Sequence, residues 1–219
     1  MAWQVSPDSP LGVFLSITPP LSAILCFVLP GFTVKEMRAM GTTGGGPILP
    51  YLSMMVQSVL WLSYGVLLHD KTIMTPNLVG TILGTLYVIA FVQLQETGGA
   101  TGQAVEKQVS LAIVIVGVMT ATVFSAELDT ARDLLGLVAA SGSVFFAFSP
   151  LAALATVLRT KSTTTMPLKT SLILFTNSSL WFMYGTLVAP NPAVAIPNGL
   201  GTIGGVLQLC VHAAFWNSR

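Results

Sequence analysis

The sequence predicts an all-α membrane protein with seven transmembrane helices in a 3+1+3 arrangement of two parallel triple-helix bundles. Three observations predict this fold. Hydrophobic residues make up 53% of the 219 residues and charged residues only 8%, whereas a soluble domain carries about 25% charged residues. Seven apolar runs are each long enough to cross ~30 Å of hydrocarbon. Finally, two segments far apart in the chain share one residue pattern.

The shared pattern is a Trp-x-x-Tyr-Gly stretch followed by a Pro-Asn pair. The first copy has Trp61 and Asn77, and the second copy has Trp181 and Asn198. The tryptophans lie 120 positions apart and the asparagines 121. Because each copy carries the motifs on two successive apolar runs, the match indicates a duplicated structural unit.

The seven apolar runs give the order of the elements. They cover residues 11–30, 50–68, 73–94, 109–126, 134–158, 168–188 and 193–215. The runs are continuous and do not alternate with polar residues, so they predict helices and exclude a barrel. We expect residues 1–97 to form the first triple-helix repeat, 98–130 a loop and linker helix four, and 131–219 the second repeat. Since three helices are an odd number, the unmatched fourth helix makes the two copies parallel.

Lysine and arginine predict the orientation of the chain. The loops after helices one, three and five, with the C-terminus, hold seven of them, and the opposite side holds only Lys71 and Arg132. The side richer in these residues is normally cytoplasmic. We therefore expect an external N-terminus and a cytoplasmic C-terminus, in the plasma membrane or an organelle membrane.

Composition also excludes several classes of function. The net charge of +1 gives no basic surface for nucleic acid. Cys26 and Cys210 lie in apolar runs, and His69 and His212 are isolated, so we expect no metal site and no cofactor. The apolar runs hold no paired carboxylates or nucleophile–base arrangement, which argues against an enzyme. A homo-oligomer remains open.

Two stretches of the second copy carry a resemblance to a known family. Trp181-Phe182-Met183-Tyr184-Gly185 and Ala195-Ile196-Pro197-Asn198-Gly199 stand close together, and the first copy echoes both. The chain resembles the SWEET sugar transporters over essentially its whole length. The resemblance implies facilitated, bidirectional diffusion of mono- or disaccharides by alternating access.

The repeated Trp and Asn residues are the predicted sugar site. A sugar has an apolar ring face, which suits an indole, and a rim of hydroxyls, which suits an amide that both donates and accepts. The alternative is that Trp packs between helices and Asn joins them. The resemblance places Trp61, Asn77, Trp181 and Asn198 in the binding pocket. Two indoles leave little room, which favours a monosaccharide. Further candidates for the pocket are Cys26, Gln57, Ser58, Phe146, Asn177 and Ser178.

Prolines and tyrosines are the predicted gate residues. Pro30 pairs with Pro150, and Pro50 with Pro167, close to the repeat offset. Proline kinks a helix interior, and the set resembles the family's inner gate and hinge, with Met166 beside it. The outer gate is expected at Tyr64, Tyr184, Lys71 and Asn191, where Asn191 replaces an acidic residue of the family pattern.

Two other functions fit seven helices. A seven-helix receptor also has an external N-terminus, but that class lacks the internal repeat. A membrane protein that interacts without transporting remains an alternative that the sequence alone leaves open.

Overall fold

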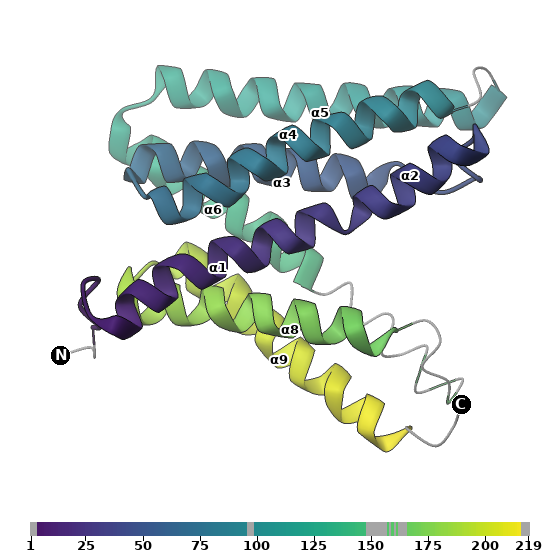
Figure 1. Ribbon diagram of the computed structural model, residues 1–219. Helices are drawn as coiled ribbons and strands as arrows, with labels where there is room; N and C mark the ends of the chain where they lie inside the picture. The colour runs from purple at the N-terminus through teal and green to yellow at the C-terminus, as the bar shows by residue number, and fades with distance from the viewer. Residues whose placement is uncertain are drawn as a thin grey trace. The chain divides into compact units, whose positions relative to one another are not determined.

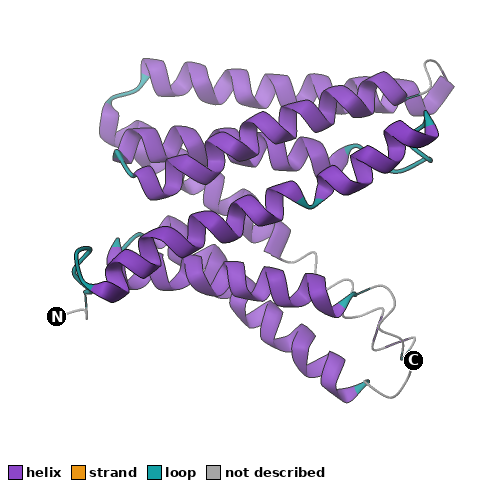
Figure 2. Ribbon diagram, in the orientation of Figure 1, coloured by secondary structure: helices purple, strands orange, loops and turns teal. Residues whose placement is uncertain are grey.

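The computed structural model describes residues 4–95, 99–147 and 166–215, with the single positions 157, 159 and 161. Every regular element among these residues is a helix (Figure 2). Five segments of this described part are long and apolar enough to cross a membrane: Pro10–Met40, Leu49–Leu68, Lys71–Leu94, Gly102–Val123 and Pro192–Ala214. The all-helical expectation therefore holds throughout the described part of the chain.

One compact unit consists of Ala23–Gly136. Its centre is the antiparallel pair α3 (Leu49–Leu68) and α4 (Lys71–Leu94), joined by a two-residue turn. Helix α2 (Pro30–Met40) packs on α4, and α5 (Gly99–Ser125) packs on α3. The buried core joins all four helices through Val34, Met37, Ile48, Tyr51, Leu52, Tyr87, Val88, Ala90, Phe91, Val105 and Ala112.

The second unit consists of Met1–Ser22 with Leu137–Arg219. It contains the first part of α1 (Pro10–Val28), the later part of α6 (Leu128–Ala147), α8 (Leu168–Met183), a π turn η1 (Tyr184–Val188) and α9 (Pro192–Ala214). Helices α8 and α9 lie side by side and are the counterparts of α3 and α4 (Figure 1). The predicted sixth run, 168–188, is thus one helix that widens into a π turn.

Three helix boundaries differ from the prediction. The stretch after helix one, expected as a loop, forms α2, because Leu29 keeps helical backbone angles and the helical path continues past Pro30. The prediction of a loop near residues 99–108 was wrong. Helix α5 begins at Gly99, and the stretch contains Ala, Gln, Glu and Lys residues, which favour helix. Helix α6 begins at Leu128 rather than 134, with Asp129 in its first turn, where the helix dipole favours a negative charge.

The duplication is visible in how the helices touch. In the first unit a Cβ added at Gly65 would lie 3.1 Å from Ile73, and in the second a Cβ at Gly185 would lie 2.9 Å from Val194. Further along each pair, the same kind of close approach joins Gly80 to Ser58, Gly84 to Met55, Gly201 to Ser178 and Gly205 to Phe175. Every one of these contacts recurs 120 or 121 residues later, so the two helix pairs are packed in the same way.

Candidate functional site

Trp61 and Asn77 lie at the same level of the antiparallel pair α3–α4. Trp61 is one turn before Gly65, which touches Ile73, and Asn77 is one turn after Ile73. Because the chains run in opposite directions, both steps lead the same way along the pair. Both side chains are half-buried. The packing of α3 on α4 therefore places the predicted indole and amide at the same level of the helix pair.

The asparagine follows a proline inside α4. Pro76 has no N–H, so it leaves a carbonyl of the preceding turn without its usual donor and disturbs that turn. Asn77, the next residue, donates a side-chain N–H to the carbonyl of Ile73 at 2.7 Å. Thr81 in turn donates its hydroxyl to the carbonyl of Asn77 at 2.8 Å. The bond to Ile73 fixes the amide and leaves its other N–H and its oxygen for a ligand, as judged from the described residues.

The tryptophan is held by an aromatic neighbour one turn further along. The rings of Trp61 and Tyr64 are 5.7 Å apart at 73°, an edge-on arrangement. Edge-on pairs are favourable because the positive edge of one ring meets the negative face of the other. The contact limits how the Trp61 indole can turn.

The second copy reproduces this geometry. Asn198 donates to the carbonyl of Val194 at 2.8 Å, following Pro197 inside α9. The rings of Trp181 and Tyr184 are 5.8 Å apart at 86°. Trp181 is buried and Asn198 is half-buried. The two predicted Trp–Asn pairs thus belong one to each unit, with the same internal bonds.

The other predicted pocket residues have varied surroundings. Ser58 is 1% exposed and lies against Gly80, and its hydroxyl has no hydrogen-bond partner within the described part of the chain. Ser178 takes the same place against Gly201. This geometry favours helix packing for both serines. Gln57 and Cys26 are half-buried, and the side chain of Phe146 lies outside the described residues.

Asn177 reveals a contact that the sequence pattern did not show. The hydroxyl of Ser22, on α1, donates to the Asn177 side-chain oxygen on α8 at 2.8 Å. Ser22 was absent from the predicted site because 155 residues separate the pair. The one sequence feature that could have indicated this contact is that Ser22 is a polar residue within the predicted first helix. The bond places a second polar pair within the unit that holds Trp181.

The predicted hinge prolines stand at helix starts. Pro30 is the first residue of α2, directly after α1 ends, and Pro50 is in the first turn of α3. Pro167 precedes α8 with extended backbone, beside the buried Met166. Pro150 lies outside the described residues. Among the other three prolines, only Pro30 interrupts a helical hydrogen bond, because it lies between two successive helices. Pro30 is therefore the only one of the three that can act as a kink.

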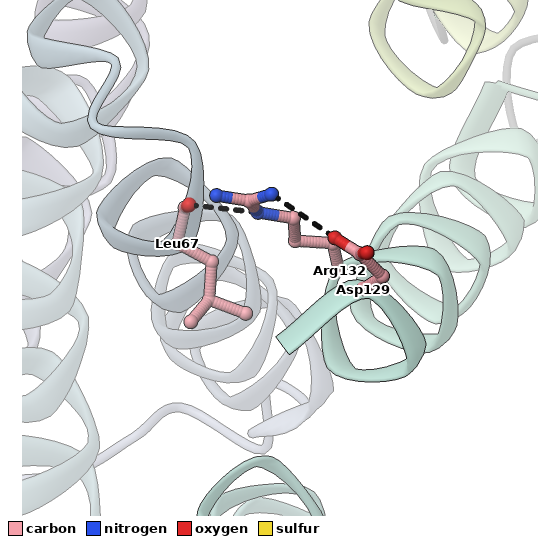
Figure 3. A network of polar contacts seen from close by, with 3 residues as sticks. All are labelled: Leu67, Asp129 and Arg132. Carbon is pink, nitrogen blue, oxygen red and sulfur yellow. Dashed lines mark hydrogen bonds and ion pairs between the residues drawn. The ribbon is translucent and has the colours of Figure 1, made fainter. Parts of the chain in front are cut away.

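The predicted outer-gate residues have two kinds of role. Asn191 caps α9 by accepting the backbone N–H of Ala193 at 3.0 Å, and Asp70, which was not among the predicted residues, caps α4 by accepting that of Ile73 at 3.1 Å. Tyr64 and Tyr184 are buried beside their tryptophans. Lys71 is exposed at the start of α4. The sequence did not single out Arg132, which bonds to Leu67 and Asp129 (Figure 3).

A comparison with models of protein families identifies the family of this chain. A family model described as a sugar efflux transporter for intercellular exchange matches residues 13–98 and again residues 133–219. The chain belongs to the SWEET family. Its members are sugar transporters, so the expectation of a transporter rather than an enzyme is confirmed.

Individual SWEET proteins agree with this assignment. The sugar transporter SWEET1 of Rattus norvegicus is 29% identical over 193 residues, 86% of each chain. The bidirectional sugar transporter N3 of Medicago truncatula is 29% identical over 198 residues, 89% of this chain and 73% of the relative. A solved eukaryotic SWEET transporter, 24% identical, matches with a TM-score of 0.84 over 94% of this chain and 96% of its own. The predicted fold class is confirmed by that likeness.

Proposed function

We propose that this protein is a facilitative, bidirectional sugar uniporter in which Trp61, Asn77, Trp181 and Asn198 bind the sugar. The observation that carries the proposal is the recurrence of one arrangement in both copies. Each copy sets an indole edge-on to a tyrosine and ties an asparagine to the carbonyl four residues before it. The names of the relatives, sugar transporter and bidirectional sugar transporter, support the substrate class.

The chemistry of each pair suits a pyranose. An indole face covers the apolar face of the sugar ring, and an amide that keeps one N–H and its oxygen pairs with two hydroxyls. Both asparagines are held by their own helix, so little side-chain entropy is lost on binding. We expect affinity on the order of millimolar, about −4 kcal/mol, since a carrier that held sugar tightly would release it slowly.

The size of the paired side chains favours a small substrate. Each copy contributes one tryptophan, and two indoles leave less room than small side chains would. Glucose or another hexose is therefore the proposed cargo in preference to sucrose. The excess of Lys and Arg in the loops after helices one, three and five supports an external N-terminus and a cytoplasmic C-terminus.

Counterflow of radiolabelled glucose in proteoliposomes of the purified protein tests the proposal. Vesicles preloaded with unlabelled glucose should take up label faster than empty vesicles, with no ion gradient. Trp61→Ala and Trp181→Ala should each reduce this uptake at least tenfold while the protein still inserts. Uptake that matches protein-free vesicles for the wild type, or that survives both substitutions, would contradict the proposal.

A further inference from the structure

The end of α3 carries a polar contact that the proposed sugar site does not use. The last turn closes on His69, with bonds from the N–H of His69 to the Val66 carbonyl and of Asp70 to the Gly65 carbonyl. This capping pattern satisfies two of the final carbonyls and leaves those that follow without a backbone donor. The carbonyl of Leu67 is the next in line.

Arg132 of α6 fills that position. Its Nε donates to the Leu67 carbonyl at 3.0 Å, and its Nη1 lies 3.2 Å from Asp129 Oδ1 (Figure 3). A cation at the carboxyl end of a helix is also favoured by the helix dipole. The Asp129 side chain is 93% exposed and that of Arg132 only 33%. The bond to Leu67 is thus the more shielded of the two.

The equivalent carbonyl of the second copy is capped as well. Leu187 follows Leu67 by 120 residues, and its carbonyl accepts the backbone N–H of Val5 at 2.7 Å. The donor differs, a backbone N–H in place of a guanidinium. Each donor comes from within or just before the first helix of a copy, and each acceptor lies at the end of a tryptophan-bearing helix. In both copies, this carbonyl is therefore the place where a donor from outside the tryptophan-bearing helix binds the end of that helix.

Docking at Leu67 places Gly136 against the Tyr64 ring. Gly136 is one turn beyond Arg132 on the same face of α6, and Tyr64 is one turn before Leu67 on α3. A Cβ at position 136 would lie 3.0–3.2 Å from the Cε2, Cζ and hydroxyl atoms of Tyr64. Tyr64 in turn stands edge-on to Trp61. A continuous series of contacts therefore leads from Arg132 to the indole.

We propose that Arg132 is a positioning residue for Trp61. By binding the Leu67 carbonyl it holds the first turns of α6 on α3, so that Gly136 supports the Tyr64 ring and Tyr64 fixes the plane of the indole. This inference rests on the proposed function, because it matters only if Trp61 binds sugar. It assigns to Arg132 an effect on sugar affinity without any contact with the sugar.

The first test compares three substitutions by the half-saturating glucose concentration of counterflow. Arg132→Leu removes the donor and should raise that concentration about three- to tenfold, the size expected for coupled neighbours. Arg132→Lys keeps a charged donor and should recover part of the loss. Asp129→Asn removes only an exposed ion pair and should stay within about twofold of wild type. An unchanged half-saturation in Arg132→Leu would overturn the inference.

The second test uses a pair of matched glycines. Gly136→Ala pushes on the Tyr64 ring and should raise the half-saturating concentration, whereas Gly117→Ala, on α5 with no heavy atom within 4 Å of the added Cβ, should not. In a Tyr64→Leu background, Arg132→Leu should add little, since both act through the same ring. Equal effects of the two alanines, or additive effects of Arg132 and Tyr64, would mean that Arg132 supports only folding.

Two results distinguish a wrong sugar site from a wrong role for Arg132. If Trp61→Ala transports glucose normally, the proposed sugar site is wrong whatever Arg132 does. If Trp61→Ala abolishes counterflow while Arg132→Leu lowers only the thermal stability and yield, the sugar site stands and the positioning role falls.

Discussion

Asn77 and Ile73 are joined by a side-chain to backbone hydrogen bond of 2.7 Å that spans the proline at position 76. The bond explains how a polar amide is accommodated in an apolar helix. The proline leaves the Thr72 carbonyl without its helical donor, and the Asn77 amide is itself satisfied at the neighbouring Ile73 carbonyl. The same residue therefore has a structural task and a proposed sugar-binding task, which experiments can separate.

Replacing the asparagines should reduce transport more than it reduces stability. Asn77→Ala and Asn198→Ala each lose one bond to the helix, worth about 1 kcal/mol, and the groups proposed to pair with sugar hydroxyls. We expect at least a tenfold fall in glucose counterflow at subsaturating sugar, with protein still present in the membrane. Radiolabelled uptake per amount of reconstituted protein measures this.

The neighbouring threonines provide matched controls for the asparagines. Thr81 and Thr202 donate to the carbonyls of Asn77 and Asn198 at 2.8 and 2.9 Å. Thr81→Val and Thr202→Val remove one hydrogen bond of the same kind at the same level without touching the amides. Their counterflow should stay near that of the wild type. Near-normal transport by Asn198→Ala would remove the case for the sugar site.

The two tryptophans should set the size of the accepted sugar. If the indoles limit space, the double substitution Trp61→Ser with Trp181→Ser should shift preference from glucose toward sucrose. The ratio of initial uptake rates for the two sugars at matched concentration is the measurement. Wild-type protein that transports sucrose as fast as glucose would count against the monosaccharide preference.

The repeat allowed much of this architecture to be predicted from the sequence. The apolar runs located the helices, a fixed offset of 120 or 121 residues paired the two copies, and the packing of Gly65 and Gly185 follows the same offset. The common level of Trp and Asn was also predictable, because both lie at matched steps from the turn between two antiparallel helices. Local pattern and periodicity carry this kind of information well.

The contacts that the sequence did not reveal join residues far apart in the chain. Arg132 reaches Leu67 across 65 positions, and Ser22 reaches Asn177 across 155. Neither partner pair belongs to a repeated motif, so the offset gave no signal. Helix α2 was missed for another reason: it is short, polar on one side and carries Lys35 and Arg38, so hydropathy alone described it as a loop.

Pro30 should affect the rate of transport more than sugar binding. It separates α1 from α2, and alanine there would supply an N–H that could join the two helices into one. If that break is the inner hinge, Pro30→Ala should lower the maximal counterflow rate with half-saturation nearly unchanged. Pro50→Ala is the control, because Pro50 stands in a first turn where no intrahelical bond is missing. A parallel change in rate and half-saturation would contradict the hinge.

The two copies differ in one buried region. The first copy packs Tyr51 between Tyr87 and Phe91, with ring centroids 6.1 and 5.8 Å from it. At the offset positions the second copy has Ser171, Gln208 and His212, all at most 5% exposed. Among the residues that the structure describes, none is a hydrogen-bond partner of the His212 Nε2 atom. A buried unpaired polar atom costs about 1–3 kcal/mol, so this region is a candidate for either a cost in stability or a response to protons.

The last prediction separates these two outcomes for His212. Proton-coupled carriers generally place Asp, Glu or His within the membrane, and α1, α3, α4, α8 and α9 contain no Asp or Glu. At equal sugar on both sides, an imposed pH gradient should therefore drive no net flux of glucose. His212→Phe, which copies the residue at the matching position 91, should leave counterflow unchanged and raise the thermal stability, because it removes the unpaired nitrogen. Sugar accumulation under a pH gradient that disappears in His212→Phe would instead make His212 a proton carrier and refute passive transport.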